Sequence, residues 1–318
     1  MEQSVSRRSF IEGAGLAAVA AGVGVATASQ ARAEEAGEPA WDYETDVVVV
    51  GYGGAGPISA ITAYDNGAEV IILEKQAQDT EDQGHQTNST RMSHSCTMDF
   101  KDEQGAYDFL KVACRDQTPD DVIKEFAKYC VGTAAWVNGI GGTMYESEDD
   151  NSEYPFETVP EGANYVAYLH EGFGHGLFAT YEKAVEERGI QVLFETPAQR
   201  LITDDSGAVI GVVATQGDTE VRLKARKGVI LACGGFEFDF EMQKAYIWVN
   251  PCRFDGNPDN TGDGIKMAQE VGADLWHMAN VGGRPCAFYD KVGHGIDYSG
   301  KPDVWVDKYG RRFTGGGV

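Results

Sequence analysis

The sequence contains no two cysteines spaced as Cys-x-x-Cys. That absence excludes the usual zinc-ribbon, iron–sulfur and c-type haem attachment motifs. The cysteines lie far apart, and a chain of 318 residues is too large to depend on disulfide bonds for a stable core. We therefore expect most of them to be free thiols in a core. They are Cys96, Cys114, Cys130, Cys233, Cys252 and Cys286.

Basic residues are also scarce. The chain has 26 Lys and Arg against 50 Asp and Glu, a formal net charge of −24. A field of that sign repels phosphate backbones, so nucleic acid is excluded as a partner, and so is an anionic membrane surface for the folded part. With apolar residues at 42% and charged residues at 24%, the composition is that of a globular protein rather than a disordered or multi-span membrane chain.

Metal-ligand spacing is missing among the histidines. Only His170 and His175 lie near each other, and a separation of five residues does not place both on one helix face. We therefore expect no metal site.

Residues 1–33 have the features of an export signal. A twin-arginine pattern, Ser6-Arg7-Arg8-Ser9-Phe10-Ile11, precedes an uncharged stretch at 13–31 that is rich in Ala, Gly and Val and poor in Leu and Ile. Ala31-Arg32-Ala33 then provides a small-x-small cleavage site. We predict a twin-arginine signal peptide over 1–33, a linker over 34–43 and a location in the periplasm or on the extracytoplasmic face of a bacterium. The alternative is a single membrane anchor, and only this segment would then touch the membrane.

A dinucleotide fingerprint follows. The run 46–50 predicts a buried strand, Gly51-Tyr52-Gly53-Gly54-Ala55-Gly56 the phosphate loop, 57–66 a helix and 68–73 a second strand, with Glu74 at its end. In this motif Gly51 allows the tight turn, Gly53 lets the backbone approach the pyrophosphate, and Gly56 lets helix pack on strand. The helix N-terminus attracts the phosphates, and Glu74 accepts the ribose hydroxyls.

The middle of the chain distinguishes an FAD-binding fold from an NAD-binding one. Short strands are predicted at 201–203, 208–215 and 220–224, followed by a buried strand that starts at Gly228 and ends in Gly234-Gly235. A parallel nucleotide fold that is interrupted by a three-stranded meander is typical of flavoproteins that bind two dinucleotides. The fold class is therefore α/β, an FAD-binding Rossmann-like parallel sheet with a β-meander and a helical insert at about 104–188, as in glutathione-reductase-like flavoproteins.

The sequence resembles the FAD-binding domain of the fumarate reductase and 3-oxosteroid dehydrogenase flavoprotein family. The resemblance spans roughly residues 44–313 and rests on the fingerprint, 172–176, 195–198, 229–236, Thr261-Gly262-Asp263-Gly264 and 310–313. It implies non-covalent FAD, with Ser89, Thr90 and Ser93 under the flavin ring, Ala198 at the adenine and Asp263 at the ribityl chain. From the residues alone, 261–264 could equally be a calcium-like acidic loop or a helix N-cap. Asn88-Ser89-Thr90 is also a glycosylation sequon. The full predicted cofactor set is Gly51, Gly53, Gly54, Ala55, Gly56, Glu74, Lys75, Ser89, Thr90, Ser93, Ala198, Ala232, Gly234, Gly235, Thr261, Gly262, Asp263 and Gly264.

Three departures from the family pattern bear on activity. Arg284 occupies the place of a substrate-binding histidine, so it is a candidate clamp for a carboxylate, and a surface arginine is the alternative. No acid follows Phe313, which argues against true fumarate reduction. We assign 44–285 to the FAD-binding domain and 286–318 to the start of a capping domain, and we expect the rest of the cap to be missing from this chain.

We therefore expect an exported FAD-dependent oxidoreductase that acts on a C–C bond adjacent to a carbonyl, by enoate reduction or by ketosteroid-like dehydrogenation. The partners expected are a small carboxylate or ketone substrate and a redox partner, either a cytochrome or a quinol-linked donor. The alternative is a non-catalytic flavin-binding fragment of a split or truncated flavoprotein.

Overall fold

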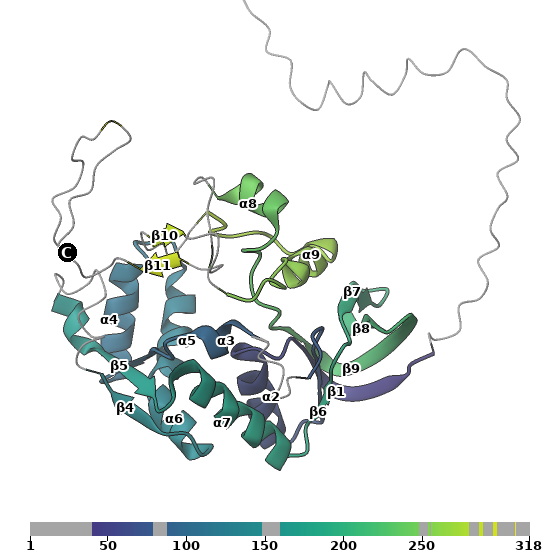
Figure 1. Ribbon diagram of the computed structural model, residues 1–318, viewed down its shortest axis with the longest axis horizontal. Coiled ribbons are helices and arrows are strands. Elements are labelled where there is room, and N and C mark those ends of the chain that lie inside the picture. The colour runs from purple at the N-terminus through teal and green to yellow at the C-terminus, as the bar shows by residue number, and fades with distance from the viewer. Residues whose placement is uncertain are drawn as a thin grey trace, which may run out of the picture. The chain divides into compact units, whose positions relative to one another are not determined.

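The computed structural model describes residues 40–78, 88–147, 160–247, 254 and 256–279, with two short strands at 286–288 and 295–297 and residue 309. Figure 1 shows a central sheet with helices packed beside it. The sheet has six strands in the order β6-β2-β1-β9-β8-β7. These strands are β1 (Tyr43–Val50), β2 (Val70–Leu73), β6 (Gln191–Leu193), β7 (Ala198–Thr203), β8 (Val209–Gln216) and β9 (Thr219–Leu231).

The parallel half of the sheet is built on β1. This strand pairs in parallel with β2 on one side and with β9 on the other, so that Val48 lies between Ile71 and Val229. Val48 and Val49 are fully buried on opposite faces of the sheet. A β-branched run that is covered on both faces is what a central parallel strand requires.

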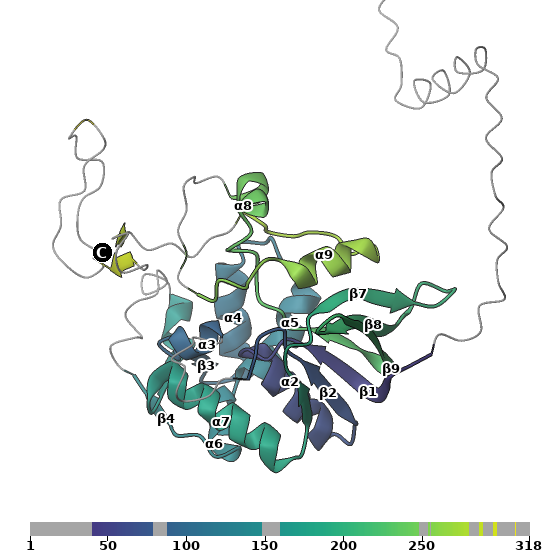
Figure 2. The ribbon, with the colours of Figure 1, turned by 45° about the vertical axis from the view of Figure 1, so that its right-hand side comes forward.

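Each face of the sheet has its own apolar core. On one face, α2 (Ala55–Asp65) and α7 (Phe173–Glu187) pack side chains such as Ile61 and Phe178 against Val49 and Ile72. On the other face, the core of Val48, Leu73 and the meander strands is closed by Met267 of α9 (Asp263–Glu270). Figure 2 shows β7, β8 and β9 continuing the sheet on the side away from α7. The predicted α/β fold with a meander is therefore confirmed.

The meander differs from the prediction at one place. The strands expected at 220–224 and from 228 onward are a single strand, β9, which pairs antiparallel with β8 and parallel with β1. The register shifts where Thr45 pairs with Ala225 and Val47 with Gly228, so Arg226 and Lys227 lie in a bulge. Both side chains form ion pairs with Asp46. These contacts hold the bulge against β1, so the strand continues through the two charged residues.

The predicted linker also ends earlier than expected. Its described part joins the sheet, because the Asp42 amide donates to the Arg222 carbonyl oxygen at 2.9 Å and the Asp42 carboxylate accepts from the Arg222 amide at 2.8 Å. The Trp41 ring lies against Gly211, where a Cβ would come within 2.8 Å of it. Residues 41–43 therefore belong to the domain.

The insert between β2 and β6 is not helical throughout. It contains a three-stranded antiparallel sheet in the order β3-β5-β4. Its strands are β3 (Thr97–Phe100), β4 (Met144–Glu146) and β5 (Tyr165–His170), and its helices are α3 (Ser89–Met92), α4 (Glu103–Ala113), α5 (Asp120–Cys130), α6 (Thr133–Gly139), the 3-10 turn η2 (Pro160–Asn164) and α7.

The helical stretch after α4 is divided into two helices, α5 and α6. Gly132 adopts a left-handed conformation, with φ at 82°, and separates α5 from α6. The Asp99 carboxylate accepts from the amides of Gly132 and Ala134 and caps the new start. Val122 and Phe126 are 52% and 54% exposed, because α5 turns its neighbouring positions inward. Those buried positions are Ile123, Ala127 and Cys130.

The remaining described elements are α8 (Phe240–Tyr246), α9 and the hairpin of β10 (Cys286–Phe288) and β11 (Gly295–Asp297). The four cysteines that the structure describes are free thiols, but only Cys130 among them is buried. No described helix is long and apolar enough to cross a membrane. The predicted signal at 1–33 lies outside the described residues.

Candidate functional site

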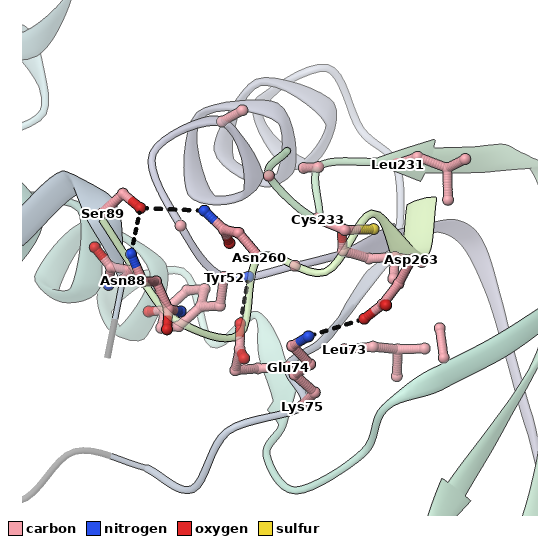
Figure 3. A pocket seen from close by; sticks show the side chains of 18 of the residues that line it. Tyr52, Leu73, Glu74, Lys75, Asn88, Ser89, Leu231, Cys233, Asn260 and Asp263 are labelled. Carbon is pink, nitrogen blue, oxygen red and sulfur yellow. Dashed lines mark hydrogen bonds and ion pairs between the residues drawn. The ribbon is translucent and has the colours of Figure 1, made fainter. Parts of the chain in front are cut away.

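A cavity of about 550 Å³ opens where the parallel strands β1, β2 and β9 end. This is the position at which open α/β sheets bind their ligands. Figure 3 shows residues from distant parts of the chain meeting around it. The lining comes from 50–55, 73–75, 88–90, 196–198, 231–235, Glu237, Asn257, Asn260, Asp263 and Met267.

The three fingerprint glycines have different surroundings. Gly51 has φ at 108°, and a Cβ there would lie 2.3 Å from the Ala232 carbonyl oxygen. A Cβ on Gly56 would lie 2.0 Å from the Gly51 carbonyl oxygen, so this glycine lets α2 pack on β1. A Cβ on Gly53 would meet nothing within 4 Å, although Gly53 lines the cavity. The space in front of Gly53 is therefore available for a ligand.

The start of α2 borders the same space, because Gly54 and Ala55 line the cavity. Gly54 is the N-cap, and its position carries no side-chain cap. The first N–H groups of a helix need partners and carry partial positive charge, so they favour an anionic group such as a pyrophosphate.

Glu74 connects the phosphate loop to the end of β2. Its carboxylate accepts from the amide of Tyr52 at 2.8 Å and from that of Gln76 at 2.8 Å. Two carboxylate oxygens offer about four lone pairs, so acceptor capacity remains for ribose hydroxyls. Ala198, the predicted adenine neighbour, lies in the same wall, where the Thr196 amide donates to the Glu74 carbonyl oxygen at 2.8 Å.

Lys75 and Asp263 form an ion pair beside the cavity, with Nζ and Oδ2 2.8 Å apart. The Asp263 carboxylate also accepts from the Thr261 hydroxyl at 2.8 Å. Burial alone would raise the pKa of Asp263, but the Lys75 ammonium and the Thr261 hydroxyl hold that pKa below its usual value. The carboxylate is therefore ionised at neutral pH.

The glycines around Asp263 serve packing. A Cβ on Gly262 would lie 2.5 Å from the Met242 sulfur, and one on Gly264 would lie 3.0 Å from the Cys233 sulfur. They let α9 pack against α8 and the end of β9, and only Asp263 of this motif lines the cavity.

The cavity brings most of the predicted cofactor residues together. Those that line it are Gly51, Gly53, Gly54, Ala55, Glu74, Lys75, Ser89, Thr90, Ala198, Ala232, Gly234, Gly235 and Asp263. Those that support the lining from behind or beside it are Gly56, Ser93, Thr261, Gly262 and Gly264. Arg284 and Phe313 lie outside the described residues. Trp276, which follows α9, is 69% exposed.

Sequence reasoning missed several polar lining residues: Asn88, Glu237, Asn257 and Asn260. The Ser89 hydroxyl oxygen accepts from the Asn260 side chain at 3.2 Å and from the Asn257 amide at 3.0 Å. The usable signal was the short polar stretch directly before Thr261 and the first acid after Gly234-Gly235. Among the described residues, no three His, Cys, Asp or Glu side chains gather in a way that could hold a metal ion.

This geometry fits FAD. An open cradle at Gly53, an uncapped α2 and a ribose acceptor at Glu74 suit any dinucleotide, and the β7-β8-β9 meander distinguishes the fold from a simple nicotinamide domain. The model of the family described as FAD binding domain matches residues 46–317. The chain belongs to this family of FAD-binding domains. Its cofactor is therefore FAD, which the cavity residues would hold.

Relatives of this FAD-binding domain include reductases and dehydrogenases. Digoxin reductase of Eggerthella lenta is 27% identical, over 98% of this chain and 65% of that protein. The acrylate reductase flavoprotein subunit of Shewanella woodyi is 27% identical, over 92% of this chain and 58% of that protein. The crystal structure of the 3-ketosteroid-Δ4-(5α)-dehydrogenase of Rhodococcus jostii superposes with a TM-score of 0.64 at 26% identity, over 76% of this chain and 56% of that one. The chain thus spans about three-fifths of the length of these relatives.

Proposed function

We propose that this FAD-binding domain serves an exported oxidoreductase that acts on a carbon–carbon bond next to a carbonyl group. The observation that carries the proposal is the FAD cavity together with relatives whose names denote reduction of acrylate, reduction of digoxin and dehydrogenation of a 3-ketosteroid. FAD, when bound, supplies hydride transfer at its ring.

The residues of the chain bind and orient the cofactor. The uncapped start of α2 attracts the pyrophosphate, and Glu74 takes the ribose while it keeps the phosphate loop against β2. Ser89 and Asn260, which are joined by a hydrogen bond, form a polar wall at the other end of the cavity. We assign Arg284 as a clamp for an anionic substrate group, since a guanidinium can bind a carboxylate through two hydrogen bonds.

Export is supported by the Arg7-Arg8 pattern and by the cleavage site at Ala31-Arg32-Ala33. The twin-arginine route carries folded proteins, which suits a protein that takes up its cofactor in the cytoplasm. An exported flavoprotein needs a redox partner outside the cytoplasm, a cytochrome or a quinol-linked donor.

The test is a steady-state assay of the whole protein that the gene encodes, loaded with FAD. The assay has two arms. One arm follows reduction of an enoate by a reduced dye, and the other follows oxidation of a 3-ketosteroid by a dye acceptor. We expect turnover in one arm at rates of about 1–10³ s⁻¹. Arg284→Ala should raise KM for an anionic substrate without changing the flavin content. Full flavin content with no turnover in either arm would favour the non-catalytic flavin-binding alternative.

A further inference from the structure

Glu237 lies on the loop between β9 and α8, and its side chain lines the FAD cavity. One of its oxygens, Oε1, accepts from the Asn260 side-chain amide at 2.7 Å. The same amide nitrogen donates to the Ser89 hydroxyl oxygen at 3.2 Å. An amide nitrogen has two hydrogens, so both are used and the orientation of Asn260 is fixed.

The paired glycines before Glu237 make room for this arrangement. A Cβ on Gly235 would lie 2.3 Å from Oε2 of Glu237, and one on Gly234 would lie 2.6 Å from Oδ1 of Asn260. We had assigned both glycines to the cofactor. In the structure both glycines line the cavity, and the carboxylate and the amide come so close to them that a side chain at either position would displace Glu237 or Asn260.

The fold indicates which end of FAD would lie beside Glu237, Asn260 and Ser89. The pyrophosphate belongs at the start of α2 and the adenosine ribose at Glu74. Figure 3 shows Ser89 and Asn260 on one side of the Tyr52 amide and Glu74 and Lys75 on the other. The half of FAD that carries the isoalloxazine ring therefore lies toward Ser89, Asn260 and Glu237.

We propose that Glu237 tunes the reduction potential of the bound flavin, with Asn260 as its positioning residue. Reduction of the ring takes up two electrons and one proton, so the ring becomes more negative. A carboxylate at the wall of the cavity opposes that change by Coulomb repulsion. No described lysine or arginine pairs with Glu237, whereas Asp263 is balanced by Lys75. The carboxylate therefore lowers the potential and makes the reduced flavin a stronger reductant. This inference rests on FAD binding and not on the identity of the substrate.

The experiment measures the midpoint potential of the flavin in the FAD-loaded full chain, by equilibration with a reference dye at pH 7. Glu237→Gln keeps the size and the acceptor for Asn260 but removes the charge. We expect the ratio of reduced to oxidised flavin at a fixed potential to rise about tenfold, which is about 30 mV for a two-electron couple. The matched control is Glu241→Gln on α8, which removes the same charge from a side chain that is 83% exposed and should leave the potential unchanged.

Glu237→Asp is the second variant. It keeps the charge, so its potential should stay nearer to that of the wild-type protein than to that of Glu237→Gln. Flavin content is measured first for every protein, so a failure of FAD binding in the wild-type protein is distinguished from a failure of tuning. The proposal is wrong if Glu237→Gln has the potential of Glu241→Gln, and also if Glu237→Gln folds but no longer retains flavin.

Discussion

At the scale of single residues, the phosphate loop shows three glycines with three separate causes. Gly51 and Gly56 are required by the chain itself, because a Cβ at either would collide with backbone. Gly53 is required by nothing that the structure describes within 4 Å. The close packing at Gly51 and Gly56 agrees with the roles that the motif predicts for them, and the approach of the pyrophosphate to Gly53 stays a prediction.

This separation gives a matched pair of substitutions. Gly53→Ala should leave the thermal unfolding midpoint nearly unchanged and should weaken FAD binding severely, because the methyl group occupies the approach of the pyrophosphate. Gly56→Ala should destabilise the fold itself, by about 1–3 kcal/mol or more, as expected for overpacking against backbone. Calorimetry and flavin titration check both. If Gly53→Ala binds FAD as the wild-type protein does, the pyrophosphate does not lie at this loop.

At the scale of elements, the strand–loop–helix–strand unit from β1 to β2 could be predicted because local patterns determine it. The β-branched runs, the glycine spacing and Glu74 all lie within one short stretch. The bulge in β9 could not be predicted in this way, because it depends on acids of β1 that are distant in the sequence. The break at Gly132 likewise depends on Asp99, which caps α6 from another strand. Asn260 and Glu237, which line the cavity beside Ser89, were missed for the same reason.

The bulge predicts a pH dependence of stability. Hydrogen bonds from Arg226 and then Lys227 lower the pKa of Asp46 to about 2. A carboxyl whose pKa is lower in the folded than in the unfolded chain stabilises the fold above the unfolded value of about 3.9, and that contribution disappears as the pH falls through the folded value. Asp46→Asn should therefore lower the unfolding temperature at pH 6, and the difference from wild type should shrink between about pH 4 and pH 2. A difference as large at pH 2 as at pH 6 would show that Asp46 acts through packing instead.

At the scale of the whole molecule, the proposed export rests on the N-terminal twin-arginine pattern. Replacing Arg7 and Arg8 together by lysine should keep the precursor in the cytoplasm, unprocessed and loaded with flavin, because the translocation machinery recognises the arginine pair. Cell fractionation with detection of the precursor and mature forms checks this. Unchanged export of the double variant would mean that the segment is a membrane anchor or an ordinary secretory signal.

The central claim is that the cavity beside β1, β2 and β9 holds FAD. It is tested most directly by purifying the chain, releasing its cofactor by heat and identifying the released molecule by chromatography against FAD, FMN and NAD standards, with Gly53→Ala as the control. We expect FAD in the wild-type protein, approaching one per chain after reconstitution, and little in the variant. NAD bound in place of flavin, or equal FAD in both proteins, would contradict the account.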